Sequence, residues 1–246
     1  NNGVHIDFIL RESKTLDVQL EGGYGEFERI QAGLRIFDHN VFGSTKSLGL
    51  RAKVSTKSLL IEPVYDTPSF WGFRNEWVGF YENSDKEDFT LERFGFETNL
   101  HRNFKKYVGL SFGYKFENTT AKNLIEELDQ LDDGYVNFSG VQSSFSYIRI
   151  DNLLTPHKGT FFKVKGEYNS KLFGSTFEFI KSEIQITQHF PISERITFSL
   201  GARLGYMKSL EAGVDIPIQV KFFNGGGNTI RGYDHNSIGP QVDGKS

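Results

Sequence analysis

Residues 196–206 read ITFSLGARLGY, and every second side chain from Ile196 to Tyr206 is apolar. The intervening positions hold threonine, serine, glycine and arginine. A strand shows this period of two when its two faces meet different surroundings. A tilted strand needs about nine to eleven residues to cross a membrane, whereas a strand of a soluble protein usually has about five or six. The stretch therefore predicts a membrane-spanning strand.

The same alternation recurs along most of the chain. No segment approaches the roughly 18 continuous apolar residues of a membrane-spanning helix, so any membrane role must use strands. An aromatic content of 15% and 26 glycines also indicate a β-rich protein. About eleven strands are predicted, near residues 15–25, 28–38, 46–57, 58–66, 75–85, 90–103, 106–118, 135–150, 160–170, 176–190 and 195–209.

The connections between these segments differ in length. Short ones, such as 38–40 and 189–191, alternate with longer polar ones, such as 118–134. Short turns at one rim and longer loops at the other are typical of an antiparallel transmembrane β-barrel. A soluble β-sandwich is the alternative, because its strands also alternate. The strand lengths favour the barrel, and so do aromatic residues near the predicted strand ends: Tyr24, Phe37, Tyr107, Phe116, Phe190 and Tyr206.

Three segments depart from the simple pattern. The alternation changes phase within 135–150 and within 176–190, and a β-bulge or a bend would explain this. Residues 121–131, AKNLIEELDQL, have helical periodicity and predict a short helix in an external loop.

Composition and motifs argue against several function classes. The chain has no cysteine, and a net charge of -3 gives no reason to expect nucleic-acid binding. Its six histidines are scattered, no nucleophile elbow occurs, and we expect no metal, no cofactor and no catalytic residue. Residues 239–246, GPQVDGKS, fit the P-loop pattern, but neither a buried strand before them nor a helix after them is predicted, so we do not assign nucleotide binding.

Residues 222–240 read FFNGGGNTIRGYDHNSIGP and are the most distinctive segment. Its glycines allow positive φ angles and close backbone approach. Arg231 is a fixed cation between two apolar residues, and it would pair with a wall carboxylate if the loop folded into a polar lumen. The alternative is an exposed loop whose arginine has no role. The candidate residues are Gly225, Gly226, Ile230, Arg231, Gly232, Tyr233, Ile238, Gly239 and Pro240.

This segment resembles the sixth extracellular loop of the outer-membrane assembly superfamily that includes BamA and TamA, here called the RG loop. The stretch from Asp151 through Pro156, Lys158 and Gly159 is similar to a periplasmic turn of that family, and 40–43, NVFG, to its turn between the second and third strands. The loop and residues 243–245 look slightly more like TamA than BamA, but the sequence does not separate the two.

The resemblance implies a barrel of sixteen strands preceded by periplasmic POTRA domains. On this basis residues 1–12 are expected to end a POTRA domain or form a linker. Residues 13–246 would form the N-terminal portion of the barrel, with about its first eleven strands and the RG loop at 222–246. The acidic partner of Arg231 would then lie after Ser246.

The function implied by the resemblance is a non-enzymatic insertase of the bacterial outer membrane. Its first strand, here 15–25, would template client strands at a lateral seam, where Gly22, Gly23 and Gly25 hold the register poorly. Expected partners are unfolded outer-membrane proteins, accessory periplasmic or inner-membrane assembly proteins, and the lipid bilayer, with lipopolysaccharide as a candidate. The alternatives are a two-partner-secretion transporter for one exoprotein, and a barrel that anchors an enzymatic or adhesive domain.

Overall fold

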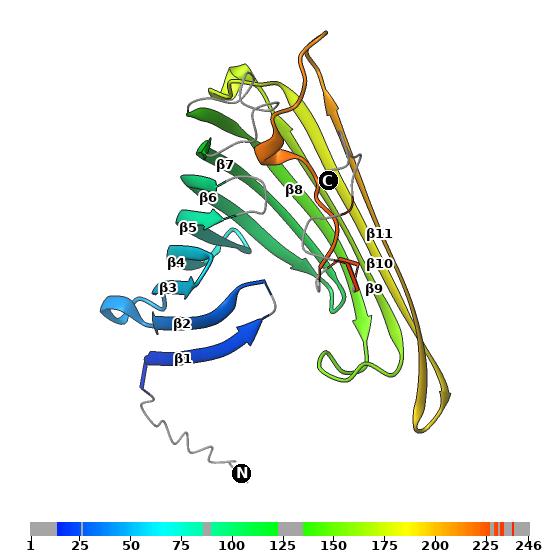
Figure 1. Ribbon diagram of the computed structural model, residues 1–246. Coiled ribbons are helices and arrows are strands. Elements are labelled where there is room, and N and C mark those ends of the chain that lie inside the picture. Colours follow the sequence, from blue (N-terminus) through cyan, green and yellow to red (C-terminus); the bar gives the residue numbers. More distant parts are fainter. Residues whose placement is uncertain are drawn as a thin grey trace.

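The computed structural model describes residues 14–25, 27–85, 90–122, 135–226, 229–230, 232–233 and 238. Within these residues, eleven strands form one antiparallel sheet in which each strand pairs with the next along the chain (Figure 1). Short 3-10 helices η1, η2 and η3 lie at Val41–Gly43, Lys171–Phe173 and Ile218–Val220. The strands are β1 (Leu16–Gly25), β2 (Arg29–Asp38), β3 (Ser47–Ser55), β4 (Ser58–Phe70), β5 (Phe73–Asp85), β6 (Thr90–Phe104), β7 (Val108–Lys122), β8 (Val136–Ile150), β9 (Gly159–Asn169), β10 (Phe179–Ser193) and β11 (Ile196–Ser209).

The register gives the sheet one apolar and one polar face. For example, Leu50 lies opposite Ile36 and Pro63, whereas the neighbouring Arg51 lies opposite Arg35 and Glu62. The apolar face is exposed, with Leu20 at 80% and Leu204 at 67% of full exposure. A β-sandwich would bury this face beneath a second sheet. The single sheet with an exposed apolar face rules out the sandwich and agrees with the predicted barrel wall.

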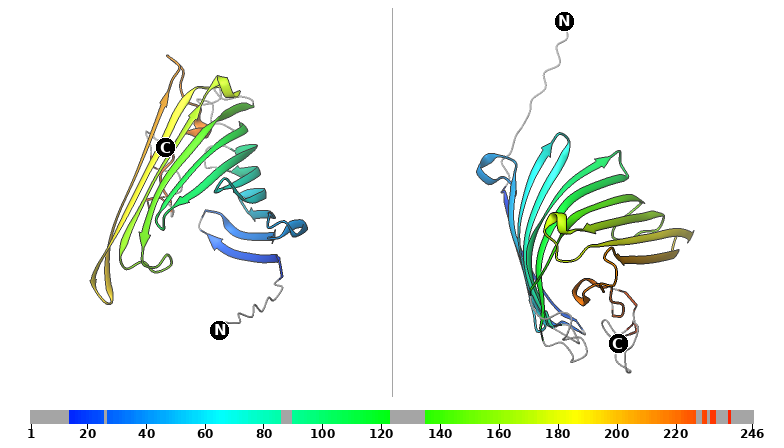
Figure 2. Two further views of the ribbon diagram at one scale, coloured as in Figure 1. Left: turned by 180° about the vertical axis from the view of Figure 1, so that it is seen from behind. Right: turned by 90° about the horizontal axis from the view of Figure 1, so that it is seen from above.

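The sheet is curved, and β1 and β11 form its two edges (Figure 2). Residues 39–46, 71–72, 105–107, 151–158 and 194–195 connect strands at one rim, which we call the turn rim. The opposite rim, which carries the connection 170–178 and the segment after β11, we call the loop rim. Among the described residues, no helix is both long and apolar enough to cross a membrane.

Of the two explanations offered for 135–150, a bulge or a bend, the bulge is excluded, because β8 pairs continuously with both neighbours. The phase changes for another reason. At the loop rim Phe138 and Phe179 point to the inner face, where they are 3% and 1% exposed and their ring centroids lie 5.9 Å apart. The connection 170–178 reaches both faces of the sheet. Phe173 contacts Tyr114 and Tyr168 on the outer face, whereas Phe177 stacks on Phe138 on the inner face, and Thr176 donates its N–H to the carbonyl of Asn137 over 2.7 Å. The covered end of the inner face is therefore apolar.

Two further predictions need correction or fall outside the described residues. The stretch 189–191 is not a turn but lies within β10, where Pro191 is accommodated by a register shift before Ser193. Proline is tolerated at such bulges because it has no N–H to donate to the ladder. The predicted helix at 121–131 begins inside β7, which continues to Lys122, and the rest of it lies outside the described residues.

Candidate functional site

The segment after β11 returns to the inner face of the sheet. Lys181 of β10 donates from Nζ to the carbonyl of Val220 in η3 over 2.7 Å, and this Nζ lies 4.5 Å from the centroid of the Phe222 ring. The same ring fills the space beside Gly205 of β11, where a Cβ would lie 3.0 Å from it. Residues 218–223, which we call the loop base, are thus held to the sheet by a cation–π contact and a hydrogen bond from Lys181.

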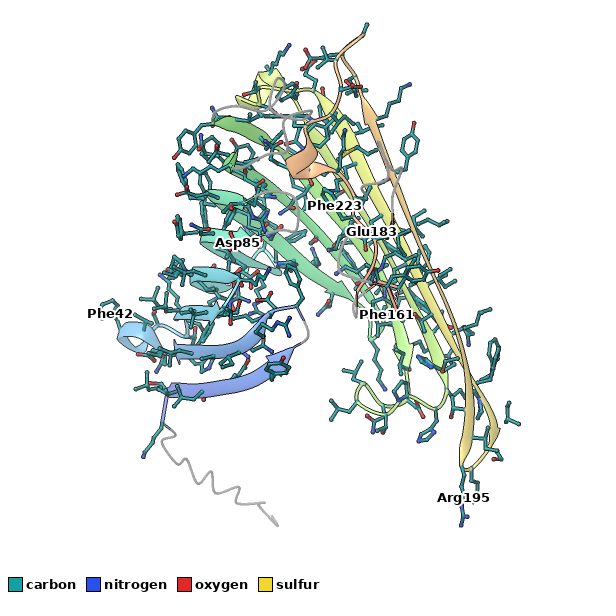
Figure 3. The ribbon with its side chains drawn as sticks, viewed as in Figure 1. Phe42, Asp85, Phe161, Glu183, Arg195 and Phe223 are labelled. Carbon is teal, nitrogen blue, oxygen red and sulfur yellow. The ribbon has the colours of Figure 1, made fainter. Side chains whose placement is uncertain are left out.

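Phe223 continues this attachment across the sheet. It packs against Leu91 of β6 and Ala121 of β7, which are only 6% and 4% exposed. Figure 3 shows Phe223 in front of the curved sheet near the loop rim. Residues 218–223 therefore lie along the inner face from β11 to β7.

A second contact anchors the beginning of this segment at the loop rim. Glu211 pairs with Lys171 of η2 and accepts the backbone N–H of Glu178 over 2.8 Å. These donors lower the pKa of Glu211, and the carboxylate raises the pKa of Lys171. The connection 170–178 and the segment after β11 are thereby joined.

The described part of the RG loop folds back on itself. Gly226 donates its N–H to the carbonyl of Tyr233 over 3.0 Å, and Ile238 donates to the carbonyl of Asn224 over 3.0 Å. The φ angles of Gly225, Gly226 and Gly232 are 111°, 85° and 92°, so these glycines occupy a region that other residues rarely adopt. Ile230 and Tyr233 are exposed. Arg231, Gly239 and Pro240 lie outside the described residues, and the pairing of Arg231 stays a prediction.

An ionic network that the sequence analysis did not find lies on the same face, two residues from Leu91. Arg93 contacts Glu82 over 2.6 Å and Glu117 over 3.0 Å, and Lys115 contacts Glu117 over 2.8 Å. Thr119 donates to the remaining Glu117 oxygen over 3.1 Å, and Glu117 is 3% exposed. Alternation predicts the face of each residue, but only the register across three strands brings these charges together.

The predicted seam residues lie at the loop-rim end of β1. Gly22, Gly23 and Gly25 pair with Ala32, Gln31 and Arg29 of β2. A Cβ added at Gly22 would meet nothing within 4 Å. Among the described strands, β1 pairs with β2 alone. The three glycines of β1 make almost no side-chain contact with β2.

The predicted periplasmic turn is a compact structure on the turn rim. Asp151 accepts the backbone N–H groups of His157 and Lys158 over 3.0 and 3.1 Å, and these donors lower its pKa. Gly159 has a φ of 131°, and a Cβ there would strike the carbonyl of Arg149. Pro156 precedes His157 in the turn. The structure thus brings Asp151, Lys158 and Gly159 together at one end of β9.

Metal binding and nucleotide binding were the other chemistries considered. In the part of the chain that the structure describes, no group of three or more histidine, aspartate or glutamate side chains is placed to hold a metal ion. The P-loop-like residues 239–246 lie outside the described ranges.

Comparison with known proteins identifies the family. The model of the Omp85 superfamily domain matches residues 16–246, which include every strand of the sheet. The chain belongs to the Omp85 superfamily. This confirms the resemblance seen in the sequence and identifies the chain as part of an antiparallel transmembrane β-barrel of the bacterial outer membrane. The apolar face of this Omp85 sheet is therefore its lipid face, and the polar face that holds the loop base lines the lumen.

Named relatives of this Omp85 chain are distant. Outer membrane protein assembly factor BamA of Neisseria meningitidis serogroup B is 23% identical over 97% of this chain and 33% of that protein. The protein of the same name from Nitratidesulfovibrio vulgaris is 23% identical over 89% of this chain and 28% of its own length. The chain thus spans about a third of these relatives.

A solved structure shares the fold. The crystal structure of BamA from Haemophilus ducreyi lacking POTRA domains 1–3 superposes with a TM-score of 0.84 at 18% identity. The match covers 94% of this chain and 48% of that one.

Proposed function

We propose that the full-length protein is a non-enzymatic assembly factor that inserts client β-barrels into the outer membrane. Membership of the Omp85 superfamily and the names of the two relatives support this function. The observation that carries the mechanism is the loop-rim end of β1, the first strand of the sheet, which holds Gly22, Gly23 and Gly25.

When the lateral seam of the barrel opens, its first strand presents a row of backbone N–H and C=O groups that can pair with an incoming strand. Gly22, Gly23 and Gly25 add no cross-strand side-chain contact, so the loop-rim end of β1 depends more on its ladder hydrogen bonds than the rest of the strand does, where Val18 and Leu20 lie opposite Ile36 and Leu34. We propose that β1 stays paired with β2, separates at low free-energy cost from the last strand of the barrel at the lateral seam, and templates a client strand by β-augmentation.

The RG loop would then brace the wall beside the lumen. Its base is attached to β7, β10 and β11 through Phe223, Lys181 and Phe222, on strands distant from β1 in the sheet order. This leaves the β1 side free to move while the other side is fixed. We further propose that residues 1–12 end a POTRA domain or linker and that residues 13–246 form the first part of the barrel.

The partners belong to the same proposal. They are unfolded outer-membrane proteins, the surrounding bilayer with lipopolysaccharide as a candidate, and accessory periplasmic or inner-membrane assembly proteins. The turn from Asp151 to Gly159 would face the periplasm.

The test of the function is a quantitative outer-membrane proteome after depletion of the full-length protein, with transcript levels as the control. Loss of many unrelated barrels would support a general, BamA-like role, and loss of a narrow subset a TamA-like one. Loss of a single secreted protein with all barrels intact would contradict the proposal and identify a dedicated transporter.

The test of the mechanism is the double variant Gly22→Val/Gly23→Val. The structure accommodates both side chains, because Gly22 has open space and Gly23 faces only the flexible Gln31 side chain. Valine favours the extended strand and fills the cross-strand gap, so we expect slower client insertion by the reconstituted full-length protein. Gly201→Val in β11, where the nearest atom would be 3.5 Å from the new Cβ, is the matched control. Unchanged insertion by the double variant would contradict templating by β1.

A further inference from the structure

The lipid face carries a groove that crosses β6 to β10 and has a volume of about 440 Å³. Its floor is a row of short side chains, since Gly166 lies opposite both Ser143 and Ser182. The next row toward the turn rim is bulkier, with Phe145 opposite Val164. The groove is therefore an apolar trough on the face that meets the hydrocarbon of the bilayer.

One end of the groove lies at the turn rim, where Phe73 and Phe104 line it. The guanidinium of Arg102 lies between these rings, 5.1 Å from the Phe73 centroid and 4.9 Å from the Phe104 centroid. Arg102 shares the lipid face because it lies opposite Leu110, another residue of the groove wall. None of the ion pairs in the described ranges includes Arg102. Within the part of the chain that the structure describes, a half-buried cation without an ion-pair partner thus stands at the mouth of an apolar groove.

A second cationic group lies on the turn between β6 and β7 and on the end of β8. Lys106 and Arg149 each place their charge 5.6 Å from the centroid of the Tyr107 ring. Tyr107 contacts Tyr147 edge to face, with ring centroids 6.4 Å apart. The two clusters are adjacent, because Val108 lies opposite both Phe104 and Tyr147.

The nearest carboxylate along the chain does not neutralise this region. Asp151, two residues from Arg149, accepts the backbone N–H groups of His157 and Lys158, and among the described residues it forms no ion pair with Arg102, Lys106 or Arg149. The outer surface of the turn rim from β5 to β8 therefore combines aromatic rings with three cations.

We propose that this surface is a binding site for an anionic phospholipid of the adjoining leaflet. Arg102, with Lys106 and Arg149, binds the phosphate, and one acyl chain lies in the groove over Gly166. A guanidinium offers paired donors that match phosphate oxygens. Aromatic rings are favoured at the interface, and basic pockets at membrane surfaces recognise acidic headgroups. The site lies on β5 to β10 and is independent of templating by β1.

The test is lipid binding to the purified full-length protein in non-ionic detergent, followed by native mass spectrometry. The probes are phosphatidylglycerol and phosphatidylcholine with identical acyl chains. We expect the first phosphatidylglycerol to bind at least about fivefold more tightly than phosphatidylcholine, and Arg102→Ala to remove this difference. Arg195→Ala is the matched control, since Arg195 is a turn-rim arginine at the tip of the β10–β11 turn, remote from the groove (Figure 3).

The acyl part of the site has its own variant. A Cβ at Gly166 would lie 3.7 Å from the Ser143 hydroxyl, an ordinary contact, so Gly166→Leu should fold and fill the floor. Gly166→Leu should weaken the binding of both phosphatidylglycerol and phosphatidylcholine. Glycerol phosphate, which has no acyl chain, should not displace phosphatidylglycerol from the wild type. If Arg102→Ala fails to fold, as judged by heat-modifiable gel mobility, Arg102→Gln replaces it.

Four results would overturn the proposal: equal affinity of the wild type for the two lipids, retained preference in the Arg102 variant, the same loss in Arg195→Ala, or unchanged binding by Gly166→Leu. The first and second would mean that the groove holds only bulk lipid. The third would mean that rim charge in general attracts the headgroup.

Discussion

The pair β1–β2 and the pair β6–β7 are built from the same kind of antiparallel ladder, yet they differ in what crosses it. Each strand of the first pair has ten residues and each of the second has fifteen. Between β1 and β2, Gly22 faces Ala32 and Gly23 faces Gln31. Between β6 and β7, Arg93 reaches Glu117 and the rings of Phe96 and Phe116 lie 6.0 Å apart. Cross-strand side-chain contacts, more than the backbone hydrogen bonds, should set the local stability of each pair. We therefore call β6 and β7 the firm wall of the sheet and β1 its weak edge.

The largest effect is expected in the firm wall. Glu117→Ala would leave Arg93 and Lys115 without their shared carboxylate on a nearly buried site, and should lower the free energy of unfolding by about 3–5 kcal/mol. Urea unfolding of the protein in lipid vesicles would measure it. Glu21→Ala on the exposed edge strand is the matched control and should change stability by less than about 0.5 kcal/mol. Equal effects of the two variants would remove the distinction between wall and edge.

Replacing one glycine by alanine in each pair of strands tests the same comparison. A Cβ at Gly95 of β6 would strike the carbonyl of Phe116, whereas one at Gly22 would meet nothing within 4 Å. Gly95→Ala should therefore destabilise the protein by about 1–3 kcal/mol through overpacking, and Gly22→Ala should be nearly neutral. The same unfolding assay applies. A neutral Gly95→Ala would show that β6 and β7 are less closely packed than described.

The contact of Lys181 with the loop base should contribute less free energy than the ionic contacts between β6 and β7. Lys181→Met keeps the aliphatic stem but loses the hydrogen bond to Val220 and the contact with Phe222, a loss of about 1 kcal/mol. Limited proteolysis should then cut the segment after β11 faster. Lys165→Met, also on the inner face of a neighbouring strand, is the control. Identical cleavage rates would mean that Lys181 does not hold the loop.

The smallest effect is a dependence on pH at the turn rim. The pKa of Asp151 is lowered in the folded state by the backbone donors of Lys158 and His157. Its contribution to stability is therefore present above the unfolded-state pKa of aspartate and is lost as pH falls through the lower folded-state pKa. Asp151→Asn should have a slightly lower thermal midpoint than the wild type near neutral pH, with the gap closing in acid. A gap that stays constant with pH would refute the ionised role.

The strands were predictable because alternation is a local pattern that directly reports the two faces of a sheet. The predicted segments at 28–38 and 195–209 differ from β2 and β11 by one residue at a boundary. The assignment of 189–191 as a turn failed because a proline can stay in a strand at a register shift. The sequence could not explain the phase change in β8, because the cover over Phe138 comes from residues nearly 40 positions later.

The candidate site was less predictable for the same reason. Positive φ at Gly225 and Gly232 follows from glycine chemistry and agrees with the prediction of special backbone geometry. Lys181 and Phe223 were missed, because their contacts join segments far apart in sequence and leave no local pattern. The one signal available was the alternation along β10, which puts Lys181 on the face opposite Ile184 and Ile186 and therefore toward the lumen.

Hydrogen exchange of the full-length protein in lipid bilayers tests the central claim most directly. The amides to compare are those of β1 that donate to β2 and those of β6 that donate to β7. In residues 20–25 of β1 these amides should exchange at least about tenfold faster than in residues 93–97 of β6, because the exchange rate reports the free energy of local opening. Gly22→Val/Gly23→Val should slow exchange in β1 and client insertion together. Equal protection of the two regions in the wild type would contradict the claim that β1 is the weak edge.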